Sequence, residues 1–232
     1  MTEKHINRRS RTTASVIGTL LGLAGILNHG IFEILQGNTS TSGFYIEAIG
    51  EAHRFWLNGT EGAFTLIHNF LITGICAILV GLVIIVWSLR YTHVKHWAGI
   101  FIILMILLTL VGGGIGQILL YLPTWALATR MNKSLGWWER NLPVRLRKIC
   151  ATLWKYSLMA TSVAWLILME LGIFGIFPGQ TDPDIILNIV YGFLFTSAIL
   201  ACITFICAFA GDIEESIRNR LPSSEDQTEP VL

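Results

Sequence analysis

The chain has 232 residues, of which 53% are hydrophobic and 13% are charged, and its formal net charge is +1. Soluble domains carry about 25% charged residues, so this composition excludes an ordinary water-soluble globule. The net charge itself says nothing about nucleic acid, because the cations gather in short segments between the apolar stretches, and we predict no nucleic-acid partner. The predicted fold class is an all-α polytopic transmembrane helical bundle, whose first partner is the lipid bilayer.

Four apolar stretches are long enough to cross the hydrocarbon core of a bilayer, which takes about 20 helical residues. They cover residues 13–35, 63–89, 151–177 and 185–210. Residues 13–211 are therefore expected to form a single transmembrane domain behind a basic N-terminus at 1–12. Residues 212–232 should start as a helical continuation and then form a largely disordered tail, because the end is rich in Ser, Glu and Pro.

Lysine and arginine residues concentrate in alternate connecting segments. The N-terminus holds Lys4 and three arginines, residues 37–62 hold only Arg54, and the short loop at 90–96 is basic again. Loops that stay in the cytoplasm are the ones enriched in Lys and Arg. We therefore predict a multi-pass protein of the cell membrane, with both termini cytoplasmic and residues 37–62 as an outer loop.

A fifth apolar stretch, residues 97–128, has two interpretations. A single crossing would export the strongly basic segment that follows it, against the usual distribution of cations. A re-entrant hairpin would keep that segment inside, and the glycines at 112–116 together with Pro123 can break a helix. We favour four full crossings plus this Gly-broken re-entrant segment. The alternative is a fifth, tilted transmembrane helix whose glycines allow close packing.

The segment at 129–150 combines Trp137 and Trp138 with six cationic residues, namely Arg130, Lys133, Arg140, Arg145, Arg147 and Lys148. Tryptophan favours the headgroup level of a bilayer, and Lys and Arg favour anionic lipid. We expect a short amphipathic element on the cytoplasmic surface, with anionic lipid contact over residues 130–148. An ordinary anchored loop is the alternative.

In this topology each full crossing carries polar residues near its outer end. An ionisable side chain within an apolar span is costly and is usually paired or functional. The predicted metal ligands are His29, Glu33, His68 and Glu170, and the predicted ligand-binding partners are Asn28, Asn69 and Asn188. The outer loop adds Glu47, Glu51, His53 and Glu61, which are expected to form an acidic mouth above the cluster.

Two histidines and two carboxylates are a ligand set for Zn²⁺, Mn²⁺ or Fe²⁺, so a divalent metal ion is the cofactor that this set suggests. The same side chains alternatively form a proton relay, bind a small polar ligand, or only hydrogen-bond one another. The leading hypothesis is a non-enzymatic, transporter-like or sensor subunit, alone or in a homo- or hetero-oligomer. The alternatives are a metal-dependent membrane enzyme with Glu33 or Glu170 as general base, and a purely structural subunit.

Three segments carry a resemblance to known proteins: NHGIFEILQGN at 28–38, GGGIG at 112–116 and RMNKSLGWW at 130–138. They resemble a group of small uncharacterised prokaryotic multi-pass membrane proteins with no assigned activity. The resemblance covers most of the chain, from the first helix to the basic segment. It implies an integral membrane protein and assigns no catalytic residue.

Overall fold

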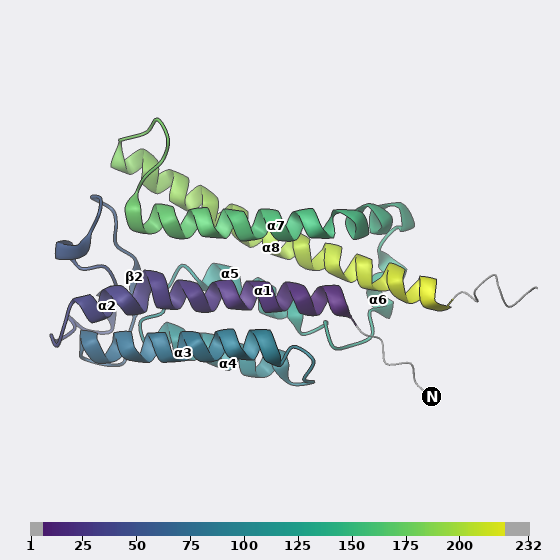
Figure 1. Cartoon of the computed structure of the whole chain (residues 1–232), viewed down its shortest axis with the longest axis horizontal. Helices are drawn as coiled ribbons and strands as arrows, with labels where there is room; N and C mark the ends of the chain where they lie inside the picture. Colours follow the sequence, from purple (N-terminus) through teal and green to yellow (C-terminus); the bar gives the residue numbers. More distant parts are fainter. Residues whose placement is uncertain (1–6, 221–232) are drawn as a thin grey trace, which may run out of the picture.

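The computed structural model describes residues 7–220, so the predictions for 1–6 and 221–232 lie outside the described residues. The chain is helical almost throughout, which confirms the all-α bundle (Figure 1). The α-helices are α1 (Arg8–Ala24), α2 (Ile31–Leu35), α3 (Phe70–Arg90), α4 (Trp97–Leu110), α5 (Ile118–Ala128), α6 (Gly136–Asn141), α7 (Val144–Phe174) and α8 (Pro183–Arg220). The remaining elements are the π-helical segment η1 (Gly25–Gly30), the 3-10 turn η2 (Glu51–His53), and strands β1 (Tyr45–Glu47) and β2 (Gly62–Phe64).

Four helices are long and apolar enough to cross a membrane: Arg8–Leu35, which joins α1, η1 and α2, then α3, α7 and α8. The second of these helices, α3, begins at Phe70, whereas the sequence predicted a start at residue 63. Residues 62–64 instead pair antiparallel with β1, and Tyr45 lies opposite Phe64. Asn69 then starts α3 as an N-cap, because its side-chain oxygen accepts a hydrogen bond from the Ile72 N–H at 3.1 Å.

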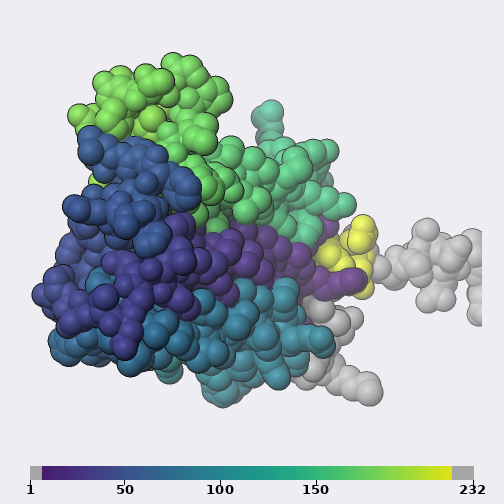
Figure 2. All heavy atoms as spheres, turned by 60° about the vertical axis from the view of Figure 1, so that its left-hand side comes forward, coloured from purple at the N-terminus to yellow at the C-terminus, as the bar shows by residue number. Residues whose placement is uncertain are grey.

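The rod of α1, η1 and α2 runs through the middle of the bundle, with α3 and α4 on one side and α7 and α8 on the other (Figure 1). We call the end that holds α2, β1 and β2 the sheet end. The opposite end, which holds Arg8 and Arg220, is the termini end (Figure 1). At the sheet end the loop between β1 and β2 lies against the α7–α8 connection (Figure 2), where Asn58 Nδ2 donates to the Pro183 carbonyl oxygen at 3.2 Å.

Glycines bring α1 and α3 into close contact. A Cβ atom added to Gly22 would lie 2.8 Å from the carbonyl oxygen of Gly81, and one added to Gly30 would lie 3.1 Å from that of Gly74. A Cβ atom at Gly18 would overlap Ser88. The central rod and α3 lie this close because these positions are glycines, which let two helix backbones approach each other.

Residues 97–128 form a hairpin whose two ends lie at the termini end. Asn132, just beyond α5, donates from Nδ2 to the carbonyl oxygens of Thr92 and Val94, at 2.9 and 3.0 Å, in the loop that precedes α4. The break falls at residues 111–117, where Gly112 and Gly114 have φ values of +101° and +89°. Pro123 stays inside α5 and ends no helix. Residues 97–128 therefore have the hairpin shape that the re-entrant interpretation predicts, with glycines at the turn.

Large apolar side chains are exposed along the outward faces of the long helices, including Leu79, Val83, Val86, Leu166 and Ile199. A monomeric soluble protein rarely exposes apolar side chains so continuously. The aromatic side chains Trp97, Trp165, Phe205 and Phe209 are instead fully buried between the helices. This distribution is the one expected for helices that contact lipid.

Candidate functional site

Three polar side chains of the central rod are almost completely buried at the sheet end. Asn28 and His29 belong to η1 and are 3% and 1% exposed, and Glu33 of α2 is 0% exposed. The π-helical turn at this point departs from regular α-helix geometry, as such turns often do at functional sites. Of the seven predicted site residues, Asn28, His29 and Glu33 are thus buried at the same end of the central rod.

Glu61, the residue before β2, reaches this cluster from the outer loop. Its Oε2 lies 2.8 Å from His29 Nε2, and its Oε1 accepts a hydrogen bond from Asn28 Nδ2 at 3.0 Å. The His29 ring N–H is poorly aligned with the carboxylate, so we describe this contact as an ion pair and not as a hydrogen bond. Asn28 Nδ2 also donates to the Met169 carbonyl oxygen of α7 at 3.4 Å.

The hairpin turn covers the other side of the cluster. A Cβ atom at Gly112 would overlap both carboxylate oxygens of Glu33, and one at Gly114 would overlap the His29 ring. The turn is held by β2, because Gly112 N donates to the Phe64 carbonyl oxygen at 2.8 Å and Ile115 N donates to that of Gly62 at 3.0 Å. Glycine is required here both for its positive φ and for the close approach of the backbone.

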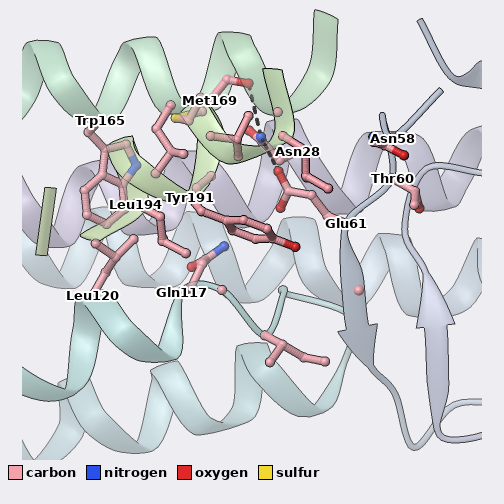
Figure 3. A pocket seen from close by; sticks show the side chains of 18 of the residues that line it. Asn28, Asn58, Thr60, Glu61, Gln117, Leu120, Trp165, Met169, Tyr191 and Leu194 are labelled. Atoms are coloured by element: carbon pink, nitrogen blue, oxygen red, sulfur yellow. Dashed lines mark hydrogen bonds between the residues drawn. The ribbon is translucent and has the colours of Figure 1, made fainter. Parts of the chain in front are cut away.

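A cavity of about 230 Å³ opens beside Glu61, between the rod and helices α5, α7 and α8. Glu61, Gln117 and Tyr191 approach the same space in Figure 3. Gln117 is 6% exposed, and neither its Oε1 nor its Nε2 has a hydrogen-bond partner; Asn28 Oδ1 is likewise unpartnered. The rest of the lining is mostly apolar or aromatic and includes Ala24, Trp56, Leu120, Trp165, Leu168, Met169, Leu187, Val190 and Leu194.

The other predicted site residues do not join this cluster. His68, Glu170 and Asn188 are exposed, and Asn69 is occupied as the N-cap of α3 and as a donor to Asn38 Oδ1. Among residues 7–220, no three His, Cys, Asp or Glu side chains gather closely enough to hold a metal ion. The predicted metal set of His29, Glu33, His68 and Glu170 is therefore not assembled, because His68 and Glu170 face outward while His29 and Glu33 face the interior.

Comparison with known proteins adds no relative to these observations. No protein-family model, curated protein or solved structure matches the chain. The resemblance noted in the sequence stays a prediction, and the function has to be argued from the cavity itself.

Acidic residues surround the cavity end of the molecule. Within residues 7–220, Arg54 is the single Lys or Arg at the sheet end, and it pairs with Glu47. Apart from the fully buried Glu33, the acids at this end are Glu47, Glu51, Glu61, Glu170, Asp182 and Asp184. Such an excess of one sign of charge around an opening attracts ligands of the opposite sign. The acidic mouth predicted from the loop is thus extended by α7, α8 and their connection.

Sequence reasoning missed the inward direction of Glu61 and the whole of Gln117. Glu61 was expected only in the acidic mouth, yet it is the partner of His29. Gln117 follows the glycines directly and is the single amide within the apolar stretch 97–128. That isolated amide is the signal that could have marked it as a cavity residue.

Acidification is expected to remove the stabilisation that Glu61 provides. Burial raises the pKa of its carboxyl, but the charge of His29 and the polar contacts from His29 and Asn28 outweigh burial, so the pKa lies below the usual glutamate value. A carboxyl with a lowered folded-state pKa stabilises the fold above its unfolded pKa and loses this effect as the pH falls through the folded value. Thermal unfolding in detergent should therefore separate the wild type from Glu61→Gln near neutral pH, and the two should converge in acid. A gap that stays constant with pH would contradict this assignment.

Proposed function

We propose that the protein is a non-enzymatic, transporter-like or sensor protein of the cell membrane that binds a small organic cation in the sheet-end cavity. The observation that carries the proposal is the buried Gln117 amide, which has no hydrogen-bond partner, together with the unpartnered Oδ1 of Asn28, beside the Glu61 carboxylate in a largely apolar cavity. Buried polar groups normally have hydrogen-bond partners, and the exceptions need an explanation. A bound ligand that hydrogen-bonds to these amide groups would explain why they have no partner within the protein.

The charge and shape of the lining favour a cation over a neutral or anionic molecule. Glu61 provides a carboxylate, and Trp56, Trp165 and Tyr191 provide aromatic rings that attract organic cations through their faces. Small-molecule sites are commonly apolar cavities with a few placed polar groups. The cavity is smaller than the roughly 300–1,000 Å³ usual for drug-sized ligands, so a ligand of few atoms fits it best.

The distribution of cations supports an orientation in which the sheet end faces away from the cytoplasm. Apart from Arg54, the Lys and Arg residues of the described chain belong to the half of the molecule toward the termini end. Because cytoplasmic segments are enriched in these residues, both termini are assigned to the cytoplasm. The cavity then opens to the outside, where Glu61 keeps 33% of its side chain exposed.

A second contact with the bilayer is proposed at the termini end. The short helix α6 lies within the segment expected to be amphipathic, and Trp137 and Trp138 of α6 line a hollow of about 300 Å³ with Arg130 and Ser134. Trp137 is 60% exposed. Indole rings next to an arginine at the headgroup level match the phosphate of an anionic lipid.

The organic-cation proposal is tested with choline and its neutral carbon isostere, in which a tert-butyl group replaces the trimethylammonium group. Trp56 and Trp165 line the cavity, so intrinsic tryptophan fluorescence of the detergent-purified chain reports binding. Choline is expected to bind at least about tenfold more tightly than the isostere, a difference of about 1.4 kcal/mol. Glu61→Gln should abolish that preference, whereas Glu170→Gln, which removes an exposed acid of the same end, should preserve it.

Equal affinity for choline and the isostere would overturn the cationic assignment and favour a neutral ligand. An unchanged preference in Glu61→Gln would place the cation elsewhere. If neither choline nor a series of primary alkylammonium ions changes the fluorescence, the cavity is not an organic-cation site.

A further inference from the structure

Glu33 is a buried carboxyl without a partner. Its side chain is 0% exposed, and neither Oε1 nor Oε2 has a hydrogen-bond partner. None of the ion pairs found in residues 7–220 involves it. The cavity does not explain Glu33 either, because Glu33 does not line it.

The elements around Glu33 bring no cation that could neutralise a carboxylate. The hairpin turn at 111–117 contains no ionisable side chain, and α3 contributes only Cys76 and, at its far end, Arg90. On the chain's own helix the neighbouring ionisable group is His29, whose partner is Glu61. An ionised, unpaired carboxylate in an apolar interior is very costly, and such groups become neutral instead.

His29 lies between Glu61, which reaches the cavity, and the turn that covers Glu33. Glu61 is partly exposed at the cavity, and its Oε2 lies 2.8 Å from His29 Nε2. His29 and Glu33 are four residues apart on the rod and so share one face. Both also lie under the same turn, His29 beneath Gly114 and Glu33 beneath Gly112. Carboxyl and imidazole groups in series are the usual components of proton relays within membranes.

We propose that Glu33 is a proton-binding site that exchanges its proton with the sheet-end cavity through His29 and Glu61. In one exchange a proton from cavity water reaches Glu33 by way of Glu61 and the His29 ring, and the carboxylate becomes a carboxylic acid. Only O–H and N–H bonds form and break, and the charge at Glu33 changes from −1 to 0. The site goes beyond the organic-cation proposal and does not require any ligand in the cavity.

The proton on Glu33 is tested by infrared spectroscopy of the detergent-purified full chain. A protonated carboxylic acid has a carbonyl stretch at higher frequency than the amide bands, and an ionised carboxylate lacks it. The wild type is expected to show this band near neutral pH, Glu33→Gln to lose it, and Glu170→Gln, an exposed control, to retain it. If Glu33→Gln fails to fold, Glu33→Asp serves, since a shorter acid should shift the band and not abolish it.

A wild-type spectrum without the band near neutral pH overturns the proposal by itself, as does a band that Glu33→Gln leaves unchanged. The route is tested by rapid transfer into heavy water, which lowers the band frequency when the carboxyl proton exchanges. His29→Asn should slow this shift at least tenfold, and Glu170→Gln should not slow it. Equal rates in His29→Asn and the wild type would exclude His29 as the relay. None of these measurements involves choline, so their failure is distinct from failure of organic-cation binding.

Discussion

Replacing Gly112 with alanine is expected to cause a large loss of stability at the sheet end. Its φ of +101° costs an L-residue about 1–3 kcal/mol. The added Cβ would also overlap both carboxylate oxygens of Glu33. Because Gly112 N is bonded to the Phe64 carbonyl oxygen, the turn cannot move away without giving up its contact with β2. Thermal unfolding in detergent measures the loss.

Gly116→Ala is the matched control for this prediction. It adds the same methyl group in the same turn, but the new Cβ would have nothing within 4 Å, and Gly116 does not have a positive φ. Its unfolding temperature should stay close to that of the wild type. Similar losses in Gly112→Ala and Gly116→Ala would mean that the turn is sensitive to any added side chain. The assignment of the loss to the φ of Gly112 and its contact with Glu33 would then be wrong.

Asp212→Ala is expected to produce a comparable loss at the termini end. Asp212 of α8 accepts hydrogen bonds from the backbone N–H groups of Arg9 and Ser10 at 2.9 and 3.0 Å, and from the Ser10 hydroxyl. These donors belong to the first turn of α1, whose own N-cap residue, Asn7, provides no side-chain cap. Asp212 therefore caps α1 from another helix. Losing a cap costs about 0.5–2 kcal/mol, and buried donors left without acceptors cost about 1–3 kcal/mol.

Glu215→Ala separates this capping effect from a simple loss of negative charge. Glu215 lies about one turn further along α8, and its side chain makes no hydrogen bond or ion pair within residues 7–220. Denaturation of the detergent-solubilised protein should distinguish the two variants, with Glu215→Ala near the wild type. If the two variants unfold alike, the contacts of Asp212 with α1 contribute nothing beyond their charge.

The arrangement of helices could be predicted from the sequence because lipid imposes strong rules on length and charge. The cations after residue 128 required the preceding stretch to return to its starting end, and the Asn132 contacts with Thr92 and Val94 show that it does. The start of α3 could not be predicted in the same way. Residues 62–64 are as apolar as a helix start, and only their pairing with β1, distant along the chain, makes them a strand.

The candidate site was predictable for the central rod and not for the other elements. Spacing along one helix groups His29 with Glu33, since residues four apart share a face. Depth in the membrane, however, does not fix the direction of a side chain around its helix axis, and Glu170 and Asn188 prove to be exposed. The direction of Glu61 depends on how a long loop folds over the bundle, which no local pattern determines.

The contact between β2 and the hairpin turn has a mechanical consequence. Glu61 is joined directly to Gly62, the first residue of β2. The carbonyl oxygen of Gly62 accepts a hydrogen bond from the Ile115 N–H, and the carbonyl oxygen of Phe64 accepts one from the Gly112 N–H. Glu61 and the hairpin turn that covers Glu33 are therefore linked through β2. If Glu61 moves, the hairpin turn has to move with it or these hydrogen bonds have to break. Movement of Glu61 at the cavity and of the turn over Glu33 should therefore occur together, in a single concerted step.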